Sequence, residues 1–171
     1  MNTDWAELGK KIGSMKDGHI GETADDAVAR KVMEELFGEA WIVKTVDYAI
    51  SWQPGRELAM NCLRLLKSPR AAQYAYEVYK RSEGEKAIQA VWLIKQLCHP
   101  MALDWVGEFL DDKNVAETGI GVLDQLVWNN EVKDDDRIEQ LLNKADTVYG
   151  GILKPKANFI REYIQKRAGI Y

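Results

Sequence analysis

The sequence predicts an all-α fold, a short α-solenoid of about 8–10 helices that stack as pairs. Two observations lead to this prediction. Every long apolar pattern has the 3.6-residue period of a helix, and no segment has the alternation of a strand. Two consecutive helix pairs also open with X-Pro dipeptides, whose prolines, Pro69 and Pro100, lie 31 positions apart. This offset is typical of solenoid repeats, which bury their apolar faces by stacking on neighbours.

The part of the chain before these pairs is expected to be helical as well. A short helix is expected within residues 1–20, and longer helices are expected over residues 23–37, 39–52 and 56–67. Thr23 is the predicted N-cap of the first long helix, because its hydroxyl can accept a hydrogen bond from the first turn. With 171 residues, the whole chain is expected to form one domain, of which residues 1–20 are the loosely attached part.

The central pairs carry helix-start signals. Ser68 is the predicted N-cap of a helix whose first residue is Pro69, where a missing N–H costs nothing. In a capping box, the N-cap residue and the residue three positions later satisfy each other's backbone N–H groups. Such boxes are predicted for Ser82 with Glu85 and for Asn114 with Glu117. The four helices of the two pairs are expected over residues 69–81, 85–97, 100–110 and 114–129.

Two further helices are expected after the central pairs. Asp136 and Glu139 have the spacing of a third capping box, which predicts a helix through about residue 145. Gly150-Gly151 marks a turn, and Pro155 is expected to open the last helix. The residues of this last helix expected to face the core are Phe159, Ile160 and Tyr163.

The sequence shows no catalytic constellation, so an enzyme, a metal site and a bound cofactor are not expected. There is no glycine-rich phosphate loop, nucleophile elbow or HExxH motif. His99 stands before a proline at a helix start, which favours a capping role over metal binding. Cys62 and Cys98 lie in apolar helical contexts and are interpreted as reduced core residues rather than a disulfide.

Apolar runs and charge suggest a location and a partner class. The chain has no 18-residue apolar run and no apolar signal sequence at its N-terminus, so a cytoplasmic protein without a membrane partner is expected. The formal net charge is −4, but residues 101–146 hold twelve acidic and four basic residues. Residues 41–100 and 147–171 each carry a charge near +4. The acidic block predicts a surface that attracts a basic protein partner.

Two tryptophans are expected outside the core, beside acidic residues. On a helical wheel, Trp92 lies opposite the apolar arc of its helix, and Trp128 lies near Glu117 and Asp124 opposite the next arc. Exposed Trp side chains among charges are typical of protein–protein hot spots. Alternatively, each Trp covers a neighbouring helix, the acids only solvate the surface, and Glu117 caps its helix. The predicted partner-binding residues are Trp92, Asp111, Asp112, Glu117, Asp124, Trp128, Asp134 and Asp135.

Nucleic-acid binding and a regulatory scaffold remain alternative functions. A solenoid that binds nucleic acid needs a basic track that neutralises phosphates. The acidic block argues against such a track, whereas one repeat earlier basic charge is available from Lys80, Arg81, Lys86 and Lys95.

Residues 85–129 resemble small HEAT-like bacterial immunity proteins of toxin–immunity systems, including contact-dependent growth inhibition. The general HEAT pattern is found in Asp112, Val115, Gly119 and Leu123, and the chain departs from it at Ala116, a position often taken by Arg. The resemblance implies a non-enzymatic inhibitor that binds a cognate toxin, often a nuclease such as a ribonuclease. In that reading, the acidic surface covers the basic active-site cleft of the toxin and presents carboxylates where phosphates would lie.

Overall fold

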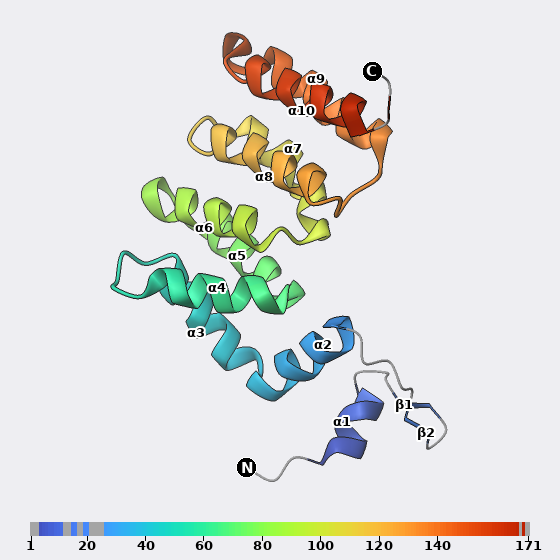
Figure 1. Ribbon diagram of the computed structural model, residues 1–171. Coiled ribbons are helices and arrows are strands. Elements are labelled where there is room, and N and C mark those ends of the chain that lie inside the picture. Colours follow the sequence, from blue (N-terminus) through green and yellow to red (C-terminus); the bar gives the residue numbers. More distant parts are fainter. Residues whose placement is uncertain (1–3, 12–14, 17–18, 21–25, 168, 170–171) are drawn as a thin grey trace.

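The computed structural model describes residues 4–11, 15–16, 19–20, 26–167 and 169, and it confirms the all-α class. Four antiparallel helix pairs follow one another along the stack (Figure 1). The pairs are α3 (Glu39–Ala49) with α4 (Arg56–Leu66), α5 (Pro69–Arg81) with α6 (Gly84–Leu97), α7 (Leu103–Asp111) with α8 (Ala116–Trp128), and α9 (Asp135–Thr147) with α10 (Lys154–Arg167). Two 3₁₀ turns, η1 (Pro100–Ala102) and η2 (Val148–Gly151), precede α7 and α10.

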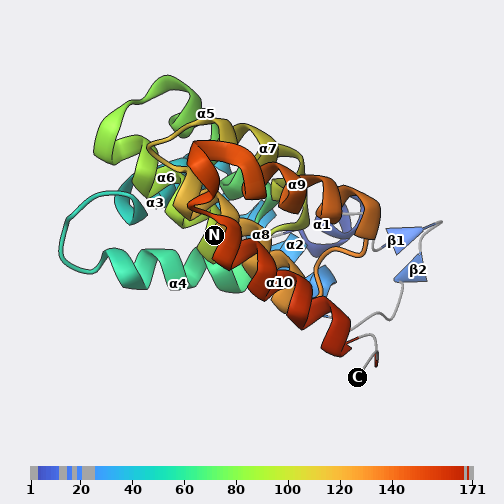
Figure 2. The same ribbon diagram turned by 90° about the horizontal axis from the view of Figure 1, so that it is seen from above.

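The pairs form two layers of helices. Helices α3, α5, α7 and α9 make up what we call the first-helix layer, and α4, α6, α8 and α10 make up the second-helix layer (Figure 2). One continuous hydrophobic core lies between the layers and contains large, fully buried side chains from successive pairs. They include Leu63, Leu93, Ile94, Phe109, Leu123, Leu126 and Leu142. No helix of the described part combines the length and apolar character that crossing a bilayer requires.

Two helices and a small hairpin stand at the N-terminal end of the stack. Helix α1 (Trp5–Lys11) packs on α2 (Asp26–Phe37), where Leu8 is buried and Lys11 forms an ion pair with Glu35. Strands β1 (Met15–Lys16) and β2 (His19–Ile20) pair antiparallel over two residues each, although no strand was expected from the sequence. The predicted N-cap Thr23 lies outside the described residues.

Two predicted helix caps are confirmed. Ser68 is fully buried, and its Oγ accepts a hydrogen bond from the Ala71 N–H at 2.9 Å and contacts Glu34 Oε1 at 2.5 Å, which ties α2 to the start of α5. The His99 Nδ1 accepts a hydrogen bond from the Met101 N–H at 3.3 Å. Cys62 and Cys98 are free, as expected.

The three predicted capping boxes are wrong, because α6 and α8 have no side-chain cap and a different residue caps α9. Helix α6 begins after Glu83, whose side chain makes no capping bond. The N-cap of α8 is Val115, not Asn114, and the Asn114 N–H that Glu117 was expected to bond donates to the Asp112 carboxylate at 2.9 Å. Asp134, not Asp136, caps α9 by accepting from the Arg137 N–H at 2.9 Å.

Helix α10 also differs from the prediction. Ile160 is buried and Tyr163 is half-buried, but Phe159 is 49% exposed and does not face the core. The neighbours in the sequence, Phe159 and Ile160, point about 100° apart on a helix, so both cannot lie at the centre of the same buried face.

A glycine sets the close approach of α7 and α8. A Cβ atom at Gly119 would stand 2.6 Å from the Phe109 Cβ and 3.3 Å from the Phe109 carbonyl carbon. On α7, a Cβ at Gly107 would stand 3.6 Å from Leu141 Cδ2, which is an ordinary contact. Substitution of Gly107 by alanine can therefore serve as the control for the same substitution at Gly119.

We expect Gly119→Ala to destabilise the protein by about 1–3 kcal/mol, because the added methyl group must push α7 and α8 apart. Gly107→Ala should leave the free energy of unfolding unchanged or raise it by up to about 1 kcal/mol, because alanine is the better helix former. Urea denaturation followed by circular dichroism measures both. Equal effects of the two substitutions would contradict this account of the α7–α8 contact.

The His99 cap makes stability depend on pH. Burial lowers the pKa of the His99 ring below its ordinary value, and Glu131 and Glu34 partly oppose this shift. A lowered folded-state pKa means that the stabilisation is complete above about pH 6.5 and is lost as the pH falls through the folded-state pKa. We expect His99→Asn, which caps without titrating, to lose less stability than the wild type between pH 7 and pH 5 in urea denaturation. A parallel loss in both proteins would refute this role.

Candidate functional site

Charge is divided between the two helix layers. The helices of the second-helix layer contain nine basic and five acidic residues, a formal charge of +4. The helices of the first-helix layer contain six basic and ten acidic residues, a formal charge of −4. The acidic excess therefore lies mainly in the first-helix layer, and not in the layer that holds Trp92 and Trp128.

Half of the acidic residues in the block 101–146 form ion pairs between elements. Lys80 of α5 pairs with Glu108 of α7, and Lys67 pairs with Glu131. Arg161 of α10 pairs with both Glu139 and Asp146 of α9, at 3.0 Å each. The remaining two pairs are Lys144–Asp111 at 2.6 Å and Lys156–Asp124 at 2.8 Å. These carboxylates join neighbouring helices and are partly neutralised there.

The predicted acidic residues do not share one surface, which corrects the sequence-based prediction of a single acidic face. Asp111 and Asp112 lie where α7 ends, and Tyr79 Oη is 3.4 Å from an Asp112 carboxylate oxygen. Asp134 and Asp135 lie at the start of α9. The 13-residue helix α8, about 20 Å long, separates these two groups. Acidic residues that lie close together in the sequence are therefore found at opposite ends of α8 in the structure.

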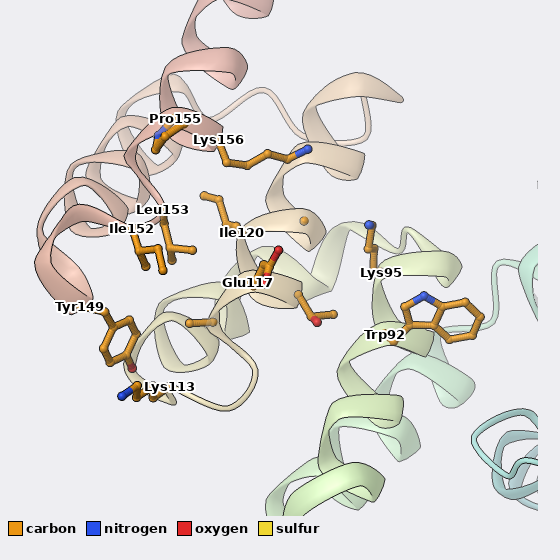
Figure 3. A pocket seen from close by; sticks show the side chains of 13 residues that line it. Trp92, Lys95, Lys113, Glu117, Ile120, Tyr149, Ile152, Leu153, Pro155 and Lys156 are labelled. Atoms are coloured by element: carbon orange, nitrogen blue, oxygen red, sulfur yellow. The ribbon is translucent and has the colours of Figure 1, made fainter.

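Trp92 and Glu117 both line one hollow of about 830 Å³, with Glu117 near its centre and Trp92 at one end (Figure 3). The hollow lies on the second-helix layer, between α6, the start of α8, the turn η2 and the start of α10. Its apolar lining comes from Ala116, Ile120, Gly121, Ile152, Leu153 and Pro155. Its polar lining comes from Lys95, Lys113, Glu117, Thr118, Tyr149 and Lys156.

Three lysines from different elements face this hollow. Lys95 belongs to α6, Lys113 to the α7–α8 turn and Lys156 to α10. Lys156 is paired with Asp124, whereas Lys95, Lys113 and Glu117 have no ion pair among the described residues. The predicted site residue Asp124 is thus a partner of Lys156 and not a free carboxylate.

Gly121 lets Lys95 lie across α8. A Cβ atom at position 121 would be 3.2 Å from Lys95 Nζ and 3.3 Å from its Cδ and Cε atoms. A glycine inside a helix costs about 1 kcal/mol relative to alanine, and here it leaves room for the lysine side chain.

Tyr149 supplies a neutral hydroxyl group to the same hollow. Its backbone adopts the left-handed conformation at φ 51°. Burial and the carboxylates of Asp112 and Asp111 raise the pKa of the Tyr149 phenol. The ordinary pKa of tyrosine already keeps the phenol protonated at neutral pH, so it can donate a hydrogen bond.

On its other side, Trp92 belongs to a stack of cationic and aromatic groups. The Arg56 guanidinium lies 4.1 Å from the centre of the Trp52 ring and 5.2 Å from that of Trp92. Arg56 Nη1 also donates to Gln89 Oε1 at 3.3 Å. Trp92 therefore forms a wall shared by the hollow and the Arg56 stack.

Trp128 points out of the core, as predicted. Its side chain is 54% exposed, and its ring centre lies 4.6 Å from that of Tyr163 on α10. Other exposed apolar side chains of this layer are Leu58 and Leu65 on α4, and Trp52 in the turn before α4 is 69% exposed. The second-helix layer thus exposes large apolar groups along its length.

Sequence reasoning missed most of the groups around the hollow. Gly121, in the interior of the predicted helix 114–129, was the available sequence signal that another group approaches this helix closely. Lys156 and Tyr149 come from a segment far along the chain, and no local pattern reveals that they line the same hollow as Glu117. Among the described residues, no cluster of three or more His, Cys, Asp or Glu side chains is arranged to hold a metal ion.

Comparison with known proteins adds no family assignment. No family model matches the chain, and neither a curated protein nor a solved structure matches it. The fold and the site therefore define the class of the protein as an all-α helical-repeat protein with an exposed, aromatic second-helix layer.

We expect Trp128→Ala to cost only about 0.5–1.5 kcal/mol of stability, because it removes one partly exposed aromatic contact with Tyr163. Phe109→Ala, at a fully buried position, should cost about 3–5 kcal/mol. Urea denaturation compares the two variants. A loss at Trp128 as large as that at Phe109 would mean that Trp128 is a core residue and not an exposed contact.

Proposed function

We propose that this protein is an immunity protein, a non-catalytic inhibitor that binds a bacterial toxin domain through its second-helix layer. The observation that supports the proposal best is the exposure of large apolar side chains on three helices of this layer and in the turn before α4, namely Leu58, Leu65, Trp128, Phe159 and Trp52. Protein interfaces centre on a few large anchors of this kind, with Trp and Tyr prominent among them. The proposal also agrees with the resemblance of residues 85–129 to HEAT-like immunity proteins.

The charges change the proposed mode of inhibition. The resemblance implies a nuclease toxin, and an acidic surface would imitate its nucleic-acid substrate. The second-helix layer carries net positive charge, and Asp124 is paired with Lys156. We therefore propose that the protein covers the toxin by shape and apolar contact, with no carboxylate row in the place of phosphates.

Nucleic-acid binding is the second candidate function. The positive charge of the second-helix layer and its three lysines at the hollow favour it. Glu117 within the hollow disfavours it, and so does the absence of arginine from the lining. A gel shift with duplex and single-stranded oligonucleotides at low salt tests this candidate directly.

The immunity proposal predicts protection of a bacterial host. We expect co-expression with the toxin domain encoded beside this gene to restore growth, and the two proteins to co-purify as a complex. Trp52→Ala combined with Trp128→Ala should weaken binding by about tenfold or more, because both substitutions remove interface anchors. Calorimetric titration of the purified proteins measures this change.

Met33→Ala is the matched control, because Met33 is exposed on α2, outside the second-helix layer. It should protect the host and bind the toxin as the wild type does. The proposal fails if the neighbouring gene encodes no toxin, or if the wild-type protein protects against none.

A further inference from the structure

We propose that the hollow between α6, α8 and α10 receives an acidic, apolar segment of the partner protein, in which carboxylates flank a large apolar side chain. The inference rests on the proposed function and names the chemistry of the partner at one place on the second-helix layer. The site is built from elements of three successive helix pairs (Figure 3).

The floor of the hollow selects for an apolar group. Ile120 and Leu153 are buried, and Ile152 leaves most of its side chain exposed at the edge. A volume of about 830 Å³ is large enough to hold several side chains of a peptide. An apolar residue that enters it would remove water from both surfaces, at about 25 cal/mol for each Å² buried.

The edge of the hollow selects for negative charge. Among the residues that line the hollow, the three lysines Lys95, Lys113 and Lys156 stand against one carboxylate, Glu117. Asp124 pairs with Lys156, and the carboxylates of Asp111 and Asp112 act on Tyr149 at one end of the hollow. The ammonium groups of Lys95 and Lys113 have no carboxylate partner among the described residues. In Figure 3 they come from different sides of the hollow, with Glu117 between them. Two carboxylates on either side of an apolar side chain match this arrangement.

The lining suits a peptide better than a nucleic acid. Single-stranded nucleic acids bind where successive bases stack on aromatic rings above a basic groove. Here the two rings, Trp92 and Tyr149, lie at opposite ends of the hollow, and aliphatic side chains fill the space between them (Figure 3). Glu117 would also repel a phosphate backbone at the centre.

The test uses peptide probes and the full-length protein. The first probe is a fluorescein-labelled twelve-residue peptide that alternates Glu and Leu, and the second has Gln in place of every Glu. A single-stranded oligonucleotide of equal charge is the third. Fluorescence anisotropy at low salt gives each Kd, and we expect the Glu peptide to bind the wild-type protein about tenfold more tightly than the Gln peptide does.

Lys95→Glu combined with Lys113→Glu should weaken binding of the Glu peptide by about tenfold or more. The matched control is Lys44→Glu with Lys133→Glu, which makes the same change of net charge at two exposed lysines away from the hollow. It should change the Kd by less than about threefold, the effect of net charge alone. Lys95→Gln with Lys113→Gln gives a milder second variant, and thermal melting verifies that every variant folds.

Two results would overturn the inference. One is equal binding of the Glu peptide by the wild type and by both hollow variants. The other is tighter binding of the oligonucleotide than of the peptide, lost in the same variants, which would assign the hollow to nucleic acid. If the hollow variants still bind and neutralise a toxin, the inference fails and the immunity proposal stands. If no toxin is neutralised but peptide binding depends on the lysines, the immunity proposal fails alone.

Discussion

Burial of apolar surface between successive helix pairs is the constraint from which the other features of the molecule follow. No single pair encloses its own apolar side chains, so each must lie on the next. The contact of Gly119 with Phe109 brings α7 and α8 so close that no Cβ atom fits at position 119. Because the core occupies the space between the layers, the opposite faces of α4, α6, α8 and α10 are left together on one side, where the hollow and the exposed aromatic residues lie.

Stacking of the helix pairs also determines which charged side chains lie next to one another. The acidic block of residues 101–146 is a property of the sequence, but in space its carboxylates meet bases from other helices. Glu108 meets Lys80 from one direction, and Asp124 meets Lys156 from the other. Partly exposed pairs of this kind contribute at most about 1 kcal/mol each, so their clearer effect is to neutralise carboxylates where neighbouring helices meet, mainly in the first-helix layer. A count of charges along the sequence therefore predicts the charge of a surface only when side chains of neighbouring helices do not form ion pairs with one another.

Much of the fold could be predicted from the sequence, because helix period, X-Pro starts and the Ser68 and His99 caps act over a few residues. The outward position of Trp128 followed from the same period. Capping boxes were predicted wrongly, since Asp112 takes the Asn114 N–H, α9 begins one residue earlier with Asp134 as its cap, and α6 has no side-chain cap. The site could be predicted only in part. Glu117 and Trp92 were identified, but Lys156 and Tyr149 join the same hollow only through stacking of the helix pairs, which no local pattern encodes.

The position of the hollow has a mechanical consequence. A solenoid holds together through nearest-neighbour interfaces, so its last unit can fray while the rest remains intact. The hollow draws its walls from α6, α8 and α10, three consecutive members of the stack. A ligand bound there would contact all three helices and would reinforce the α6–α8 and α8–α10 interfaces at once. Binding would then suppress local unfolding of the C-terminal helix pair, and part of the binding free energy would offset the conformational entropy lost there.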